Sequence, residues 1–379
     1  MRRVVLRAPL RRRGAAFLVL LRAPLRAPLR RDVFLRVAFL RVAFLRVVFR
    51  RVVLRGAALR VAFLRVLRFG AACAGAAFFF LRLTAIGRGI ILSLVTSDQG
   101  CCLPYTVLRG LMQVFADDGT RIDAHVDGVQ GTHAVVLIHG FPLSRAIWDS
   151  QRTPLARNHF VITPDLRGFG KSGVPEGPYL METLASDVAV LLDALGVRRA
   201  SLAGHSMGGY VALAFARMFS ERVARLALVP SRLGADSSEQ SAARRALADA
   251  AERERSIEPV IGAYVPRLLA PDTPAQAPEV AQRAYELARG TSPRGAAAAL
   301  RGMALRASSE DIAGDLDVPV LMLAGECDQT IPMQEAREIA ERFPRGRLVV
   351  CESSGHLPML EEPNCVEAAL DEWLRDEPR

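Results

Sequence analysis

The chain has 379 residues, of which 51% are hydrophobic, and this is enough for a sizeable core in one large α/β domain or two average domains. Its net charge of +11 is unevenly distributed, because residues 1–110 hold 22 Arg and two acidic residues, so that residues 111–379 carry −9. The basic pI of about 10.2 therefore belongs to the N-terminal part and gives no indication of a nucleic-acid partner for the remainder.

The N-terminal part is repetitive. Copies of RVAFL and close variants fill residues 31–55 and place an Arg at every fifth position. On a helix, a step of five residues rotates the side chain by about 140° beyond a full turn, so that successive arginines point in all directions. On a strand, the same step places successive arginines on opposite faces. Because neither structure gains an apolar face, we expect residues 1–110 to be a low-complexity extension that is disordered or is not translated in the native protein.

The ratio of lysine to arginine supports that second alternative. The chain has 50 basic residues, and only Lys171 among them is a lysine, as expected for a GC-rich source. A repeat in such DNA, read from a start codon set too far upstream, explains the extension, since Met112 opens a stretch with the pattern of ordinary folded protein.

A membrane anchor or an export signal is the alternative for the extension. A membrane span needs about 20 apolar residues without regular charges. The best segment, residues 69–97, is interrupted by Arg82 and Arg88. Binding to nucleic acid or anionic lipid is possible on charge alone, but no module that interleaves aromatic and basic residues is present, and we expect no nucleic-acid partner.

From Met112 onward, short apolar runs alternate with helical patterns, which indicates βαβ units and a mostly parallel sheet flanked by helices. The predicted strands are 112–116, 121–126, 134–140, 159–165, 200–206, 223–231, 318–326 and 347–353. The predicted helices are 183–196, 207–220, 333–343 and 364–374. Between about 232 and 312 amphipathic Ala-rich stretches replace the strands, and we interpret them as a helical cap within a domain of residues 111–379.

Three cysteines fall in this domain, at positions 327, 351 and 365, and none belongs to a C-x-x-C pair. Since they lie in or beside apolar runs, we expect reduced, buried thiols rather than disulfides or metal ligands. This favours a reducing compartment and a cytoplasmic protein, with a membrane-anchored or exported protein as the alternative. The sequence does not predict the oligomeric state.

The stretch LAGHSMGGYVALA, residues 202–214, places a serine between glycines where a strand meets a helix. G-x-S-x-G in this context is typical of a nucleophile elbow, whose strained turn requires neighbours without bulk. The pattern predicts Ser206 as a nucleophile, supported by Gly204 and Gly208.

A serine hydroxyl needs a base, and the base needs an acid that orients it. Asp328 follows the strand predicted at 318–326, and His356 follows the strand predicted at 347–353. This Ser, Asp, His order at strand ends predicts His356 as the base and Asp328 as its acid, with Glu326 as the alternative acid.

The developing oxyanion needs two fixed donors. We predict the backbone N–H groups of Phe141, in the glycine turn of LIHGFP, and of Met207, because Pro142 has no N–H.

The remaining polar residues suggest supporting roles. We expect His139 to support the oxyanion loop and His205 to point away from Ser206. His125, His133 and His159 are interpreted as surface or structural residues. The charged pair Arg244–Arg245 is interpreted as part of a solvated helix face. No pair of histidines has metal-ligand spacing, and neither a metal nor a cofactor is expected.

The motifs HGFPLSRAIWD (139–149), PDLRGFGKSG (164–173), GHSMGG (204–209), GECDQTIP (325–332) and SGHLPMLEEP (354–363) resemble the α/β-hydrolase superfamily, in its capped esterase-like branch. The resemblance covers about residues 112–379. It implies an α/β-hydrolase fold with a cap and an enzyme such as a carboxylesterase, an enol-lactonase, a cofactor-free haloperoxidase acting as a perhydrolase, or a carbon–carbon bond hydrolase. Ser206 argues against the dehalogenases and epoxide hydrolases of similar outline, which place a carboxylate at the elbow.

The predicted function is therefore a serine hydrolase that acts on a small to medium carboxylic ester or lactone through an acyl-enzyme. Perhydrolase and carbon–carbon hydrolase activities on the same residues are alternatives, and a hydrolase-fold binding protein without turnover is another. Six cap residues, Tyr264, Val265, Leu268, Leu269, Tyr285 and Met303, are candidates for an apolar pocket lining.

Overall fold

A computed structural model describes residues 78–86, 89–97 and 107–375, with side chains described for residues 110–375. Most of the predicted N-terminal extension lies outside the described residues. Within it, two strands that the repeat pattern did not predict, β1 (Phe78–Ile86) and β2 (Gly89–Ser97), pair as a two-stranded sheet. No helix in the described part of the chain is both long enough and apolar enough to cross a membrane.

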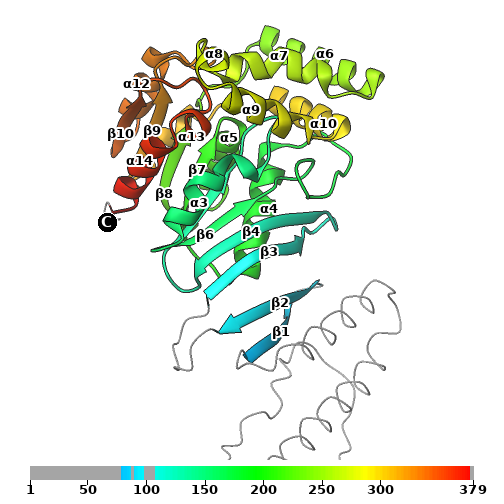
Figure 1. The fold of residues 1–379 in the computed structure, drawn as a ribbon, viewed down its shortest axis with the longest axis vertical. Helices are drawn as coiled ribbons and strands as arrows, with labels where there is room; N and C mark the ends of the chain where they lie inside the picture. Colours follow the sequence, from blue (N-terminus) through cyan, green and yellow to red (C-terminus); the bar gives the residue numbers. More distant parts are fainter. Residues whose placement is uncertain (1–77, 87–88, 98–106, 376–379) are drawn as a thin grey trace, which may run out of the picture. The chain divides into compact units, whose positions relative to one another are not determined.

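The main sheet has eight strands in the order β10-β9-β8-β7-β5-β6-β4-β3 (Figure 1). Its strands are β3 (Val107–Phe115), β4 (Arg121–Val129), β5 (Ala134–Ile138), β6 (Phe160–Pro164), β7 (Ala200–His205), β8 (Val223–Val229), β9 (Val320–Gly325) and β10 (Gly346–Cys351). Strands β10 to β6 run parallel, whereas β4 is antiparallel to both β6 and β3. All eight predicted strands are present and the predicted α/β class is confirmed, although β3 begins five residues before Met112.

The parallel strands are short apolar runs because helices cover both of their faces. Every residue of β5, β6, β7, β8 and β9 is buried, as expected for strands covered on both sides. The order of strands reverses after β6, so right-handed crossovers place α4 on the opposite face from α3. The carboxyl ends of β5 and β7 meet at this reversal, which is where open α/β sheets bind ligands.

The covering helices are α3 (Asp149–Leu155), α4 (Met181–Ala194), α5 (Met207–Met218), α12 (Met333–Glu341), α13 (Pro358–Glu361) and α14 (Pro363–Arg375), with short 3₁₀ turns at Arg145–Trp148 and Ser220–Arg222. Four of the covering helices, α4, α5, α12 and α14, match the predicted ones closely, whereas α3 and α13 were not predicted. Helix α3 packs on α14, and α4 packs on α5. The fully buried Trp148 and Trp373 are the largest side chains of this core.

A helical insertion, residues 238–313, lies between β8 and β9. It consists of α6 (Ser238–Glu254), α7 (Glu258–Leu268), α8 (Thr273–Gln276), α9 (Pro278–Arg289), α10 (Pro293–Ala304) and α11 (Glu310–Ala313). Figure 1 shows α6, α7, α9 and α10 grouped together beyond one end of the strands. Helix α6 begins with a capping box, in which the Ser237 hydroxyl accepts from the Gln240 N–H and the Gln240 side chain accepts from the Ser237 N–H.

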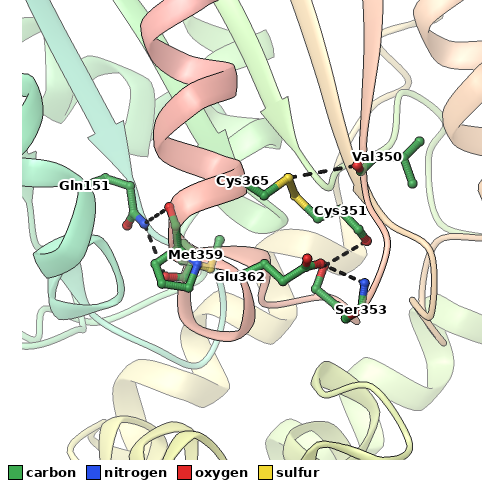
Figure 2. The surroundings of a disulfide bond; sticks show 9 residues. Gln151, Val350, Cys351, Ser353, Met359, Glu362 and Cys365 are labelled. Atoms are coloured by element: carbon green, nitrogen blue, oxygen red, sulfur yellow. Dashed lines mark hydrogen bonds between the residues drawn. A yellow bond between two sulfur atoms is a disulfide. The ribbon is translucent and has the colours of Figure 1, made fainter.

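The expectation of reduced cysteines is wrong for two of the three. Cys351, at the end of β10, and Cys365, in the first turn of α14, form a disulfide (Figure 2). Cys327 is free and exposed rather than buried. The two paired residues are 14 positions apart and meet only because α14 packs back against β10, a tertiary contact that spacing alone does not indicate. The argument for a reducing compartment thereby loses its basis.

Candidate active site

Ser206 occupies the turn between β7 and α5 in a strained backbone conformation. Its φ of 50° and ψ of −111° lie outside the regions favoured by residues with a side chain. A Cβ atom at Gly204 would lie 2.2 Å from the carbonyl oxygen of Gly208, and one at Gly208 would lie 2.4 Å from that of Ile138. Only glycine fits at either position, as the sequence pattern predicts.

The neighbouring strand holds this turn in place. The Ser206 N–H donates to the carbonyl oxygens of Val229 and Pro230, at 3.1 and 3.0 Å. The hydroxyl of Ser231 donates to the Ser206 carbonyl oxygen at 2.8 Å. Because three hydrogen bonds fix the backbone of Ser206 to the end of β8, the strain is stored by tertiary structure rather than relaxed by the loop.

Asp328 and His356 form a buried pair across two loops. His356 Nδ1 donates to Asp328 Oδ2 at 2.7 Å, and each side chain is only 1% exposed. The second carboxylate oxygen accepts from the N–H groups of Thr330 and Ile331, at 2.6 and 3.0 Å. Burial raises the pKa of Asp328, but the His356 charge and these hydrogen bonds outweigh it and leave the pKa below its ordinary value. Glu326, the alternative acid, is exposed.

The other ring nitrogen of His356, Nε2, is buried and has no hydrogen-bond partner among the residues that the structure describes. Both His356 and Ser206 line the same cavity of about 820 Å³. An imidazole whose Nδ1–H is fixed by a carboxylate presents a basic lone pair at Nε2. The ring is thus prepared to accept a proton inside the cavity that Ser206 borders.

His205 and Glu361 hold the loop of His356 in position, a role that the sequence did not predict for either residue. His205 Nε2 donates to the His356 carbonyl oxygen at 2.8 Å, and the two rings lie 5.1 Å apart. Burial and the neighbouring His356 lower the pKa of His205 well below its usual value, so that it serves as a neutral donor. Glu361 Oε2 accepts from the Gly355 N–H at 2.8 Å. The sole signal in the sequence was the position of both residues within the quoted motifs.

The loop after β5 carries the predicted oxyanion donor. Among the described residues, no hydrogen-bond acceptor is found for the N–H of either Phe141 or Met207. His139 is fully buried behind this loop, where Nδ1 donates to the Gly140 carbonyl oxygen at 3.0 Å and Nε2 accepts from the Leu166 N–H at 3.0 Å. The loop is therefore braced from the PDLRGFGKSG segment, and His139 has the supporting position expected for it.

The wall of the cavity comes largely from the helical insertion and differs from the predicted lining. Of the six candidates, Tyr264, Leu268 and Met303 line the cavity, whereas Val265, Leu269 and Tyr285 are not part of it. The interpretation of Arg244 as a solvated helix residue is wrong. Arg244 lines the cavity, and its side chain is 17% exposed, because α6 packs on α10 and turns this residue inward.

The remaining histidines lie elsewhere. His133 Nε2 is within 2.7 Å of the Ser201 hydroxyl, His125 lies 2.9 Å from Asp127, and His159 contacts the ring of His133 edge-on. Over residues 110–375 no group of three or more His, Cys, Asp or Glu side chains is arranged to hold a metal ion.

Comparison with known proteins shows the family to which this fold belongs. The family model described as alpha/beta hydrolase fold matches residues 133–363. A solved structure titled as a thermophilic esterase from Thermogutta terrifontis (malate bound) is 39% identical, with a TM-score of 0.66 over 71% of this chain and 98% of that one.

Two characterised relatives extend the comparison. The 3-oxoadipate enol-lactonase 2 of Acinetobacter baylyi is 27% identical over 64% of this chain and 88% of its own length. The 2-hydroxy-6-oxo-2,4-heptadienoate hydrolase of Pseudomonas putida is 29% identical over 67% of this chain and 94% of its own length. With the family model matching more than half of the chain, the protein belongs to the α/β-hydrolase fold family.

Proposed function

We propose that this protein is a serine hydrolase that cleaves a small to medium carboxylic ester or lactone through an acyl-enzyme. One observation carries the proposal: Asp328 fixes His356 so that its Nε2, which has no partner among the described residues, lies buried at a cavity bordered by Ser206. The esterase and enol-lactonase relatives act on bonds of this class, as their names state, and they support it.

In the first half of the reaction, Ser206 Oγ attacks the ester carbonyl carbon while His356 Nε2 takes its proton. The negative charge that develops on the carbonyl oxygen is met by the N–H groups of Phe141 and Met207, for which the described part of the chain offers no acceptor. Collapse of the tetrahedral intermediate breaks the bond to the alcohol, which leaves with the proton from His356. Asp328 stabilises the imidazolium and keeps its proton on Nδ1.

In the second half, water attacks the acyl-enzyme. His356 Nε2 takes a proton from the water, the tetrahedral intermediate forms again over the same donors, and Ser206 leaves with that proton. The free acid is released and the serine is restored. No redox step is needed.

The helical insertion would act as the cap that bounds the substrate. It supplies Arg244, Tyr264, Leu268 and Met303 to the cavity wall. A cavity of about 820 Å³ falls within the usual range for small-molecule sites, about 300–1,000 Å³. This size suits a small to medium substrate rather than a polymer.

A carbon–carbon bond hydrolase is the second candidate, since the relative from Pseudomonas putida is 29% identical and bears that kind of name. It would use the same serine, histidine and aspartate, so that the two candidates differ in the substrate rather than in these residues.

A fluorophosphonate probe and p-nitrophenyl esters test the proposal on the full chain. We expect the probe to label the wild type and to fail on Ser206→Ala, and we expect ester hydrolysis to fall to background in that variant. The matched control is Ser220→Ala, which changes an exposed serine just beyond helix α5. This variant should keep both probe labelling and ester hydrolysis. Full ester hydrolysis by Ser206→Ala would refute the mechanism. Absence of labelling and turnover in the wild type would favour a hydrolase-fold binding protein.

A further inference from the structure

The cavity beside Ser206 carries an excess of positive charge. Three arginines line it, Arg232, Arg244 and Arg267, against one carboxylate, Glu335. The rest of the wall is mainly Ala, Leu, Met, Tyr and Phe. Charged side chains are costly to place in an apolar pocket unless they are paired, and the few polar groups of such a pocket fix the orientation of its ligand. Arg232 is paired with Glu335 and Arg267 is exposed, so the surroundings of Arg244 decide whether the cavity favours an anionic ligand group.

Arg244 is held rigidly with its guanidinium at the wall. Its Nε donates to one carboxylate oxygen of Asp236 and its Nη2 donates to the other, at 3.3 Å. Its Nη1 donates to the Tyr264 hydroxyl at 2.8 Å and approaches the Met303 sulfur at 3.5 Å. The sulfur is a weak acceptor, so this Nη1–H is available to a stronger one.

Asp236 does not neutralise this site, because it faces two guanidinium groups. Arg306 Nη1 lies 3.4 Å from Asp236 Oδ1, and its guanidinium carbon stacks 3.8 Å from the centre of the Tyr210 ring, which lines the cavity. Two cations share one buried carboxylate and leave one positive charge in excess. Burial lowers the pKa of Arg306, and repulsion from Arg244 and Arg232 acts in the same direction. An anion bound in the cavity would offset that repulsion.

Tyr264 supplies a donor beside Arg244. Its oxygen accepts the Arg244 hydrogen bond, and no acceptor for its own O–H is found among the described residues. Burial raises its pKa, so that the hydroxyl keeps its proton. The ring lies 4.9 Å from that of Phe141, in the loop with the proposed oxyanion donor. Arg232, three residues beyond the end of β8, adds little net charge, because its Nη2 donates to Glu335 at 3.1 Å and to the Thr330 carbonyl oxygen at 2.8 Å.

We propose that Arg244 and Tyr264 bind a carboxylate on the acyl part of the substrate, so that the enzyme prefers half-esters of dicarboxylic acids or lactones that bear a free carboxylate. This substrate class rests on the proposed function, because it assumes that the acyl group lies in this cavity during attack by Ser206. The apolar wall would hold the methylene chain between the ester carbonyl and the carboxylate.

Binding of two matched amides to the full-length wild type, measured by isothermal titration calorimetry, tests the proposal independently of turnover. The probes are glutaric acid monoanilide and pentananilide, which have five acyl carbons each and differ only in the terminal carboxylate. Because charge-assisted hydrogen bonds stabilise the bound carboxylate, the monoanilide should bind about 10-fold to 100-fold more tightly than pentananilide. This preference should shrink as salt is raised.

Because each variant removes one hydrogen bond to the carboxylate, Arg244→Gln and Tyr264→Phe should each reduce the preference for the monoanilide by about 10-fold. Arg245→Gln, which removes the same charge from an exposed neighbour on α6, should keep it. In the Arg244→Gln protein, Asp236 keeps its ion pair with Arg306, so that no buried carboxylate is left unpaired. Thermal unfolding checks that the variants are folded. Equal affinity for both amides in the wild type, or an unchanged preference in Arg244→Gln and Tyr264→Phe, would overturn the proposal. Failure of the proposed function would be seen separately, as missing fluorophosphonate labelling of Ser206 with the amide preference intact.

Discussion

Removing the disulfide should lower the melting temperature of the protein while leaving its catalytic rate almost unchanged. The bond joins residues 14 positions apart, Cys351 at the end of β10 and Cys365 on α14. Closing a loop of this length restricts the unfolded chain by about 3 kcal/mol in the chain-entropy account. At about 2–4 °C per kcal/mol for a domain of this size, the double variant Cys351→Ser/Cys365→Ser should unfold about 6–12 °C below the wild type.

Activity at 25 °C should change little, because other contacts hold the segment between the disulfide and His356. The Ser353 N–H donates to Glu362 at 2.8 Å, as Figure 2 shows, and the Gly355 N–H donates to Glu361 at 2.8 Å. The His356 N–H donates to the Leu268 carbonyl oxygen at 2.9 Å. The loop therefore keeps its anchors when the sulfur bridge is lost.

Differential scanning fluorimetry and ester hydrolysis on the same preparations measure the two effects. Cys327→Ser removes the exposed free thiol and is the matched control, with an unchanged melting temperature. Peptide mapping after alkylation should show Cys351 and Cys365 joined before reduction and Cys327 alkylated. A double variant that melts with the wild type, or alkylation of Cys351 without reduction, would refute the reasoning.

Three further predictions concern single side chains. Asp328→Asn should lower kcat for ester hydrolysis by about 10⁴-fold while the fold is kept, since the wrong His356 tautomer is then favoured. Steady-state kinetics measure this change, and a loss below 10-fold would contradict the assigned role. Glu361→Gln should lower kcat and the melting temperature together, because the carboxylate accepts from Ala270, Thr273 and Gly355, whereas Glu279→Gln, at an exposed carboxylate of the insertion, should change neither. Burial and the nearby Arg225 lower the pKa of His133 to about 4, so that the unfolded chain binds a proton between about pH 6.5 and 4 that the folded chain does not. Stability should therefore fall across that window as the pH falls, by roughly 1 kcal/mol after allowance for partial exposure; urea titrations at several pH values measure it, and an equal pH slope in His133→Asn would contradict it.

The sequence predicted those parts of the structure that are fixed locally. The strands of the parallel sheet are continuous apolar runs, and the glycines around Ser206 reflect contacts within the turn itself, with a Cβ at Gly204 only 2.2 Å from Gly208. The loop positions of Asp328 and His356 follow from strand ends. Such features depend on residues close in the chain, which is why period and spacing indicate them.

Features that depend on packing between distant segments were missed. Arg244 lies on an Ala-rich amphipathic helix, where a charged residue is ordinarily solvated, and its burial results from contacts with Tyr264 and Met303, 20 and 59 positions away. The Cys351–Cys365 pair forms where α14 packs on β10. His205 was expected to point away from Ser206, and its contact is with the carbonyl of His356, 151 residues later.

The helical insertion is bonded to three loops that would take part in the chemistry, those of Pro142, Asp328 and His356, whereas the Ser206 turn is bonded to the end of β8. The Thr291 hydroxyl donates to the Pro142 carbonyl oxygen at 2.7 Å, beside the proposed oxyanion donor. Gln329 donates to the Leu269 carbonyl oxygen at 3.0 Å, next to Asp328, and His356 bonds to Leu268. A change in the insertion that alters the substrate pocket therefore also shifts the positions of His356, Asp328 and the oxyanion loop. It follows that substitutions around Leu268 should change kcat together with KM, whereas Arg244, which bonds to none of these loops, can alter substrate preference without displacing them.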